Sequence, residues 1–196
     1  MNKKKLCFIL ASLTIVSFSL SLYHVDFSIP PTSDDSYGYV LRTFSILNDD
    51  LSEPARKTIG WPAFLSIFYS FFDSTNFLDY VNTARLLSMI ISSASVFPMY
   101  LLARKFFNQK ISIVASCMFA FEPHLLYNST HALSESIFIF LIILASSFIL
   151  EKKYSWSIYI SFMFAGLAVW MRFNGLITII ILSIILLFTY KIDKKN

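Results

Sequence analysis

The sequence is poor in charged residues. Asp, Glu, Lys and Arg make up 14% of its 196 residues, whereas a soluble domain of this size carries about 25%. Glycine is scarce as well, with four residues, while hydrophobic types make up 56% of the chain. This balance excludes an ordinary soluble domain and predicts an integral membrane protein.

Cysteine is also nearly absent. The two cysteines, Cys7 and Cys117, both lie within apolar segments, so neither a disulfide framework nor a metal-ligand spacing is visible. The formal charge of +4 does not indicate binding to nucleic acid, because the basic residues form small clusters between apolar runs. Such clusters are typical topology signals of membrane proteins, and we expect no nucleic-acid partner.

The apolar runs predict an all-α, polytopic integral membrane protein that forms one domain over residues 1–196. Residues 1–23 combine three lysines with an apolar run and lack a small-x-small cleavage site, so we expect an uncleaved first transmembrane helix. Residues 24–80 are predicted to form a structured outer loop with an interfacial helix at 61–72. Residues 81–190 supply five further transmembrane helices, which gives about six with both termini inside.

The charge distribution supports this topology. Ten of the twelve acidic residues and all three histidines fall on the predicted outer side. Eleven of the sixteen Lys and Arg residues fall on the predicted inner side, as the positive-inside rule requires: Lys3, Lys4, Lys5, Arg104, Lys105, Lys110, Lys152, Lys153, Lys191, Lys194 and Lys195.

The third predicted transmembrane helix is unusually short. It begins at Ile111 and meets Glu122-Pro123-His124 after a run of apolar residues that spans about 17 Å as a helix. Either this helix stops short, or the polar residues sit at membrane depth, where irregular backbone must line a cavity or be buried in protein.

Ionisable residues gather on the predicted outer side and are the candidates for function. Such residues are costly at or within transmembrane helices and by default indicate a functional site, although an individual Arg or Glu can instead extend to the lipid headgroups. Their common location favours a shared cavity, lined by Asp34, Asp35, Arg85, Glu122, His124, His131, Glu135 and Arg172.

A series of short motifs accompanies these residues in order along nearly the whole chain. They are Asp35-Ser36-Tyr37-Gly38-Tyr39, Gly60-Trp61-Pro62, Arg85-Leu86-Leu87, Tyr100-Leu101-Leu102-Ala103-Arg104, Phe121-Glu122-Pro123, Leu133-Ser134-Glu135 and Arg172-Phe173-Asn174-Gly175. In this order and topology the chain resembles the amino-terminal module of the GT-C superfamily of lipid-phosphate-dependent glycosyltransferases. The protein O-mannosyltransferase and aminoarabinose-transferase group is the most similar. Family enzymes carry more transmembrane helices than the six predicted here.

The resemblance implies a sugar donor on a polyprenyl phosphate and a carboxylate that deprotonates the acceptor hydroxyl. Asp35 fits this base because Tyr39 stands at the spacing found in the family, and Asp34 would orient it or repel it as a like charge. The sequence Asp-Asp-Ser replaces the commoner Asp-Glu of the family, so the choice between the two aspartates stays open.

The resemblance also implies cations that hold the donor phosphate. Arg172, at a membrane boundary, is the strongest candidate, followed by Arg85 and Lys57. His124 or His131 could bind the phosphate or a sugar hydroxyl. Glu135 could orient Arg172, bind a sugar hydroxyl, or ligate a metal. No cofactor is certain, and the divalent metal ion used by some family members stays open, because widely spaced His and Glu residues are a weak metal signal.

Three functions are compatible with the sequence. The first is a glycosyltransferase, or its catalytic half, at the outer face of the cell membrane. The second is a truncated or split non-catalytic protein that binds lipid phosphate or a partner subunit supplying further helices. The third is a small transporter with an intramembrane Glu135–Arg172 pair, which is disfavoured because no internal repeat is visible.

Overall fold

The computed structural model describes residues 2–50, 58–71, 73–151, 154 and 156–193. These residues form α-helices with turns and links between them and contain no strand. The helices are α1 (Lys3–His24), α2 (Asp34–Leu47), α3 (Gly60–Tyr69), α4 (Phe77–Ala94), α5 (Val96–Ala103), α6 (Gln109–Ala120), α7 (Pro123–Thr130), α8 (Glu135–Ile149), α9 (Trp156–Met171) and α10 (Gly175–Asp193).

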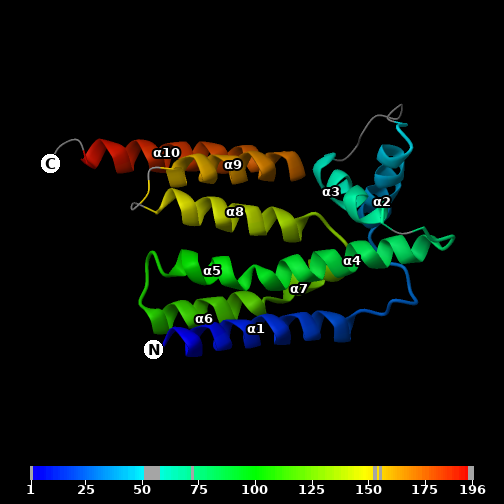
Figure 1. Ribbon diagram of the computed structural model, residues 1–196, viewed down its shortest axis with the longest axis horizontal. Helices are drawn as coiled ribbons and strands as arrows, with labels where there is room; N and C mark the ends of the chain where they lie inside the picture. Colours follow the sequence, from blue (N-terminus) through cyan, green and yellow to red (C-terminus); the bar gives the residue numbers. More distant parts are fainter. Residues whose placement is uncertain (1, 51–57, 72, 152–153, 155, 194–196) are drawn as a thin grey trace.

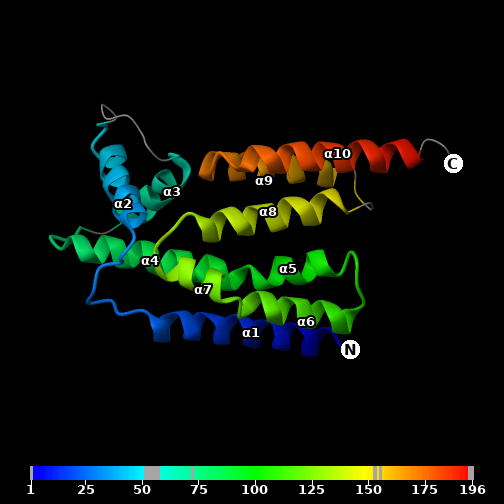
Figure 2. The ribbon, with the colours of Figure 1, turned by 180° about the vertical axis from the view of Figure 1, so that it is seen from behind.

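The helices run back and forth along one long axis, as Figures 1 and 2 show. Helix α1 is followed by α4 with α5, by α6 with α7, and then by α8, α9 and α10, each antiparallel to the one before. Helix α1 begins at the end of the bundle where α10 ends. We call this the basic end, because Lys3, Arg104 and Lys110 lie there; α2 and α3 lie at the opposite, distal end.

Small polar residues occupy many contacts between these helices, beside the clusters of buried apolar residues. Ser17 donates a hydrogen bond from Oγ to the carbonyl oxygen of Ala120 at 2.9 Å, and Ser161 does the same to Ala145 at 2.6 Å. The hydroxyls of Ser88 and Ser136 lie 2.8 Å apart. Helices in membranes pack through such small residues because lipid already solvates the large apolar ones.

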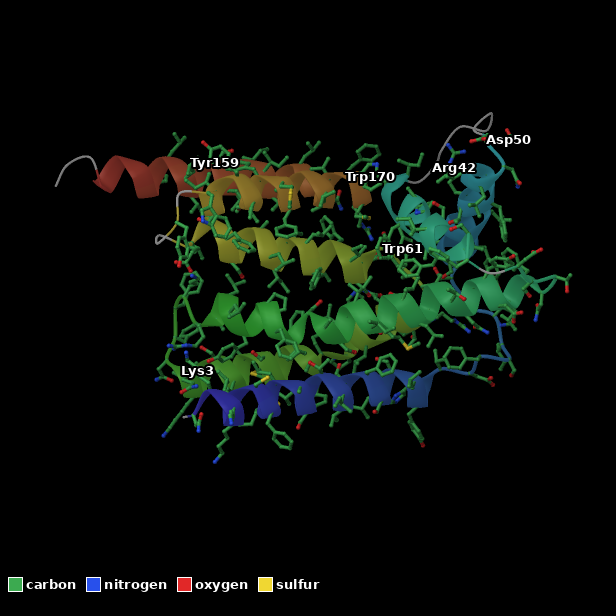
Figure 3. All side chains as sticks on the ribbon, in the orientation of Figure 1. Lys3, Arg42, Asp50, Trp61, Tyr159 and Trp170 are labelled. Atoms are coloured by element: carbon green, nitrogen blue, oxygen red, sulfur yellow. The ribbon has the colours of Figure 1, made fainter. Side chains whose placement is uncertain are left out.

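Large apolar side chains instead cover the outside of the bundle. On α9 they form one exposed stripe at helical spacing, with Tyr159 78% exposed and Trp170 45% exposed. Figure 3 shows both side chains on the outer surface of α9 and Trp61 on the inside. An apolar surface around an interior that is partly polar is the distribution expected of a protein solvated by lipid.

Two helical segments are long and apolar enough to cross a bilayer among the described residues. They are Lys3–His24 and Phe77–Ala103. The other apolar helices are shorter than the roughly 20 residues that a ~30 Å hydrocarbon core requires; they are Gln109–Ala120, Glu135–Ile149, Trp156–Met171 and Gly175–Phe188. The all-helical fold is thus confirmed, whereas crossing by six helices stays a prediction.

The run of apolar residues that begins at Ile111 stops short as a helix before Glu122-Pro123-His124, whereas the depth of these residues in the membrane stays a prediction. Helix α6 stops at Ala120, and a new helix, α7, starts at Pro123. The carboxylate of Glu122 accepts a hydrogen bond from the amide of Leu125 at 2.6 Å and so caps α7. Glu122 therefore serves as a helix cap, which satisfies one of the free amides at a helix start.

The segment between α1 and α4 contains more helix than the sequence predicted. The interfacial helix expected at 61–72 corresponds to α3, but the aspartate pair, expected in a loop, opens the additional helix α2. Both helices pack on α4 through buried aromatic rings. Phe44 meets Tyr80 with ring centroids 4.8 Å apart, and the hydroxyl of Tyr69 donates to the carbonyl of Tyr80 at 2.7 Å.

A close backbone contact fixes α3 against the distal end of α9. A Cβ atom at Gly60 would lie 2.4 Å from the carbonyl oxygen of Trp170, which is closer than atoms can approach. The hydroxyl of Thr58 also donates to the carbonyl of Met171. Only glycine lets the start of α3 lie this close to the last turn of α9, which leads into Arg172.

This contact predicts a specific loss of stability. Gly60→Ala should lower the free energy of unfolding by about 1–3 kcal/mol, because the added methyl group pushes backbone against backbone. Gly166→Ala is the matched control, since a Cβ at Gly166 on α9 meets nothing within 4 Å. We expect Gly166→Ala to be neutral or to stabilise. Thermal unfolding of both variants in the same lipid or detergent tests this, and equal stability of the two variants would contradict it.

Candidate functional site

The turn between α9 and α10 holds Arg172 at the distal end of the bundle. The amide of Arg172 still bonds to Ala168 at 2.9 Å, and the amide of Gly175 bonds back to the carbonyl of Arg172 at 2.9 Å. A Cβ at Gly175 would lie 2.5 Å from the backbone nitrogen of Val169, so glycine is required for this tight reversal. The Arg-x-x-Gly spacing is thus explained by the turn that presents the arginine.

Arg172 forms an ion pair with Glu135, the first residue of α8. The guanidinium Nη1 contacts Oε1 of Glu135, and the two side chains are 30% and 26% exposed. The guanidinium also lies over the ring of Phe138, with its carbon 5.9 Å from the ring centroid. Such a partly desolvated arginine keeps its charge and its planar set of donors, which suits it to bind an anion.

The second carboxylate oxygen of Glu135 is less well satisfied. Oε2 is buried and accepts no hydrogen bond from any residue that the structure describes. Buried carboxylate oxygens are normally hydrogen-bonded, because desolvation without a partner is costly. Glu135 therefore retains an acceptor that a hydroxyl or amine donor could use.

The aspartate pair opens α2 at the same end of the bundle. Asp35 is exposed in the first turn of this helix, where the helix dipole favours a carboxylate. The side chain of Asp34 lies outside what the structure describes. Tyr39, one turn further along, is 5% exposed, and its hydroxyl lies 2.9 Å from Oγ of Ser134. The structure thus places Tyr39 in the core beside the α7–α8 turn.

His131 lies in that turn, and its ring is held from both sides. Nδ1 lies 2.9 Å from the carbonyl of Tyr127, and Nε2 lies 3.4 Å from the hydroxyl of Thr32. The ring also packs on Tyr127, with centroids 4.1 Å apart. His124 is exposed in the first turn of α7. The two histidines lie at opposite ends of α7 and do not form one cluster.

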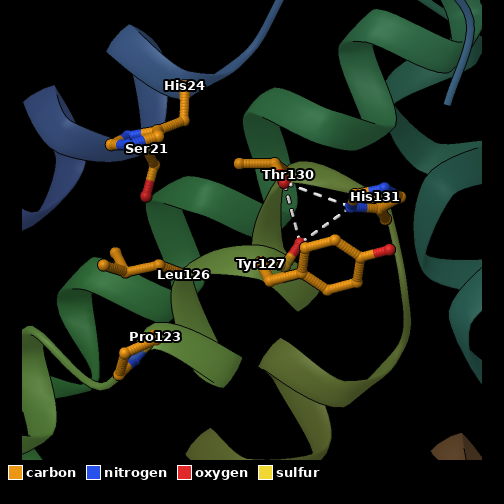
Figure 4. A pocket seen from close by; sticks show the side chains of 7 residues that line it. All are labelled: Ser21, His24, Pro123, Leu126, Tyr127, Thr130 and His131. Carbon is orange, nitrogen blue, oxygen red and sulfur yellow. Dashed lines mark hydrogen bonds between the residues drawn. The ribbon is translucent and has the colours of Figure 1, made fainter.

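A cavity of about 400 Å³ lies between α1 and α7 and includes His131. Figure 4 shows the seven side chains around it, which are Ser21, His24, Pro123, Leu126, Tyr127, Thr130 and His131. Arg172, Glu135 and Asp35 are not among them. The ion pair therefore does not line this cavity.

Arg85 has a different environment from Arg172. It is 5% exposed, and its Nη1 donates to the carbonyls of Asp26 at 3.2 Å and Ile29 at 2.9 Å. Asn82 reinforces the same segment by donating to the carbonyl of Phe27 at 2.9 Å. These bonds satisfy backbone carbonyls of the link between α1 and α2, so Arg85 anchors this link to α4.

The link is further ordered by its own side chains. Ser28 donates from its hydroxyl to Oδ1 of Asp26 at 2.6 Å and from its amide at 2.9 Å. These hydrogen bonds hold the pKa of Asp26 below its ordinary value, because they stabilise the charged carboxylate. Lys57, the remaining predicted phosphate ligand, lies outside the described residues.

The structure thus brings together part of the predicted set. Glu135 and Arg172 form one ion pair. Tyr39 contacts the turn that leads into Glu135, and His131 lies in this turn. Within the described part of the chain, no three His, Cys, Asp or Glu residues are arranged to hold a metal ion. The sequence did not single out Trp61 or Ser134 as candidate site residues, although both belong to the motifs that carry the family resemblance.

The described residues form an all-helical bundle with an apolar exterior and a half-buried acid–arginine pair at its distal end. A family model described as dolichyl-phosphate-mannose-protein mannosyltransferase matches residues 56–195. This match covers more than half of the chain, which therefore belongs to this family of GT-C-type membrane glycosyltransferases. No curated protein and no solved structure gives a match.

The extent of the match bears on the predicted site. It includes Arg85, His131, Glu135 and Arg172, while Asp34 and Asp35 precede it. The family assignment thus rests on residues 56–195, and the two aspartates lie outside the part of the chain that the match covers.

Proposed function

We propose that this protein is a membrane glycosyltransferase, or the catalytic half of one, that transfers a sugar from a polyprenyl-phosphate donor to an acceptor hydroxyl. The observation that carries the proposal is the half-buried Glu135–Arg172 pair at the distal end of a chain that belongs to the mannosyltransferase family. The family implies a dolichyl- or polyprenyl-phosphate sugar donor and a location in membrane lipid.

Arg172 is the proposed phosphate ligand. Its guanidinium can donate two parallel hydrogen bonds to phosphate oxygens, a geometry that lysine cannot reproduce. Glu135 keeps the guanidinium oriented through the ion pair, and its buried Oε2, which no described residue hydrogen-bonds, is the acceptor that we assign to a sugar hydroxyl. His131 is a second donor candidate from the neighbouring turn, while Arg85 is committed to backbone carbonyls and supports the fold.

Asp35 is the proposed general base. Its carboxylate takes the proton of the acceptor hydroxyl as the oxygen attacks the anomeric carbon. The new glycosidic bond forms while the bond from the anomeric carbon to the phosphate oxygen breaks, and the polyprenyl phosphate leaves with the electron pair. The configuration at the anomeric carbon inverts. The exposure of Asp35 in the first turn of α2 supports this role, because an acceptor can reach it there.

We place the protein in the cell membrane with the basic end in the cytoplasm and the distal end outside, following the positive-inside rule. A partner subunit that supplies further helices is compatible with this arrangement. If the chain binds the lipid donor without transferring its sugar, we favour a protein that needs such a partner subunit for activity.

The phosphate role predicts the behaviour of Arg172 variants. Arg172→Ala should weaken binding of a polyprenyl-phosphate mannose by about 10- to 100-fold, since charge-assisted hydrogen bonds contribute about 1.5–3 kcal/mol. The donor affinity of Arg172→Lys should lie between those of Arg172→Ala and the wild type, because lysine keeps the charge but lacks the planar guanidinium. Arg104→Ala, which removes an exposed arginine at the basic end, is the control and should bind normally. Equal donor affinity of Arg172→Ala and wild type would show that Arg172 is an interfacial anchor.

The base role predicts a loss of transfer without a loss of binding. Asp35→Asn should bind donor normally and lose transfer about 10²- to 10⁴-fold, which is the usual contribution of general-base catalysis. Asp34→Asn should be milder, because its motif lacks the Tyr39 spacing. The measurement uses purified protein in lipid with a radiolabelled polyprenyl-phosphate mannose, and follows sugar release or transfer. If Asp35→Asn transfers sugar as fast as the wild type, Asp35 is not the general base.

A further inference from the structure

The turn of residues 131–134, between α7 and α8, receives hydrogen bonds from three other helices. Ser36 of α2 donates from its hydroxyl to the carbonyl of His131. Trp61 of α3 donates from its indole nitrogen to the carbonyl of Ala132 at 3.0 Å. Ser88 of α4 donates to the carbonyl of Leu133 at 3.4 Å. Three successive carbonyls of one turn are thus bound from three different helices.

The fourth residue of the turn is bound through its side chain. Oγ of Ser134 lies 2.9 Å from the hydroxyl of Tyr39, which belongs to α2. Both residues are buried, with exposed fractions of 0% and 5%. Since each hydroxyl needs a partner away from water, this bond fixes the position of α2 relative to the start of α8.

The backbone of the turn is itself unusual. Ala132 has a φ of 57°, and it is one of two non-glycine residues with positive φ among the described residues. Ala132 is also 1% exposed. A left-handed conformation at a buried alanine persists only where the surroundings determine it strongly, and such positions concentrate at functional sites.

The position of this turn connects two parts of the proposed site. Ser134 directly precedes Glu135, which holds Arg172. Tyr39 lies four residues after Asp35 on α2, about 6 Å along the helix. One buried hydrogen bond therefore lies between the helix of the proposed base and the residue that orients the proposed phosphate ligand.

We propose that the 131–134 turn is a positioning device in which Tyr39 and Ser134 set the placement of the Asp35 helix relative to the Glu135–Arg172 pair. Trp61 supports the turn from α3. Tyr39 and Ser134 are positioning residues: they act on the reaction through Asp35, Glu135 and Arg172. For its effect on turnover this inference rests on the proposed function.

The test removes the bond from either side. In the purified full chain in lipid, Tyr39→Phe and Ser134→Ala should each lower kcat for transfer from polyprenyl-phosphate mannose by about 10- to 100-fold, as misplaced reacting groups do. KM for the donor should stay unchanged, because Arg172 remains. The double variant should be no slower than the slower single variant, because both substitutions remove the same bond.

Tyr69→Phe is the matched control. Tyr69 is also a buried tyrosine of the distal core, 2% exposed, but its hydroxyl donates to Tyr80 rather than to the turn. We expect this variant to lose a hydrogen bond and some stability while keeping the wild-type kcat. If Tyr69→Phe lowers kcat as much as Tyr39→Phe, or if Tyr39→Phe matches wild type, the positioning role is overturned.

A second measurement does not depend on turnover. Amide hydrogen exchange across residues 131–138 should rise equally in Tyr39→Phe and Ser134→Ala and stay at the wild-type level in Tyr69→Phe. If the wild type transfers no sugar while exchange responds in this pattern, the proposed function fails and the coupling of α2 to the turn stands. Unchanged exchange in Tyr39→Phe would overturn the coupling itself.

Discussion

The hydrogen bonds that converge on residues 131–134 are the constraint on which the distal end depends. They join α2, α3 and α4 to the point where α8 begins, and α8 begins with Glu135. They link the start of α8, and so the ion pair with Arg172, directly to the helix that carries Asp35. The Gly60 contact with Trp170 completes the arrangement, because it fixes α3 against the helix that leads into Arg172.

The same requirement, that buried polar groups find partners within the protein, shapes the rest of the bundle. Serine hydroxyls bond to carbonyls of their own or neighbouring helices, as Ser17 does to Ala120 and Ser161 to Ala145. These small side chains let helices approach closely, and many large apolar residues, such as those of the exposed stripe on α9, face outward. The serine-rich composition and the scarcity of charge thus have one cause, which is solvation by lipid.

The sequence was sufficient for the helical class and the family, because these depend on local hydrophobic runs and short motifs. It predicted that Glu135 could orient Arg172, and the structure pairs them. It did not predict that the aspartate pair opens a helix, since residues 33–39 show no long apolar period. The hydrogen-bond partners of Arg85 and Tyr39 were also beyond it, because these partners lie 56 and 95 residues away in the chain. Contacts at such separations arise from packing, which local patterns do not encode.

The central claim is that the distal end binds a polyprenyl phosphate beside Glu135 and Arg172. Photo-crosslinking tests it most directly, with a polyprenyl phosphate analogue that carries a photoreactive group next to the phosphate and with mass-spectrometric mapping of the labelled peptides. The account predicts labelling of the peptides that contain Glu135 and Arg172, which unlabelled polyprenyl phosphate should compete away. Labelling confined to the basic end, around Arg104 and Lys110, or labelling that unlabelled lipid does not reduce, would contradict it.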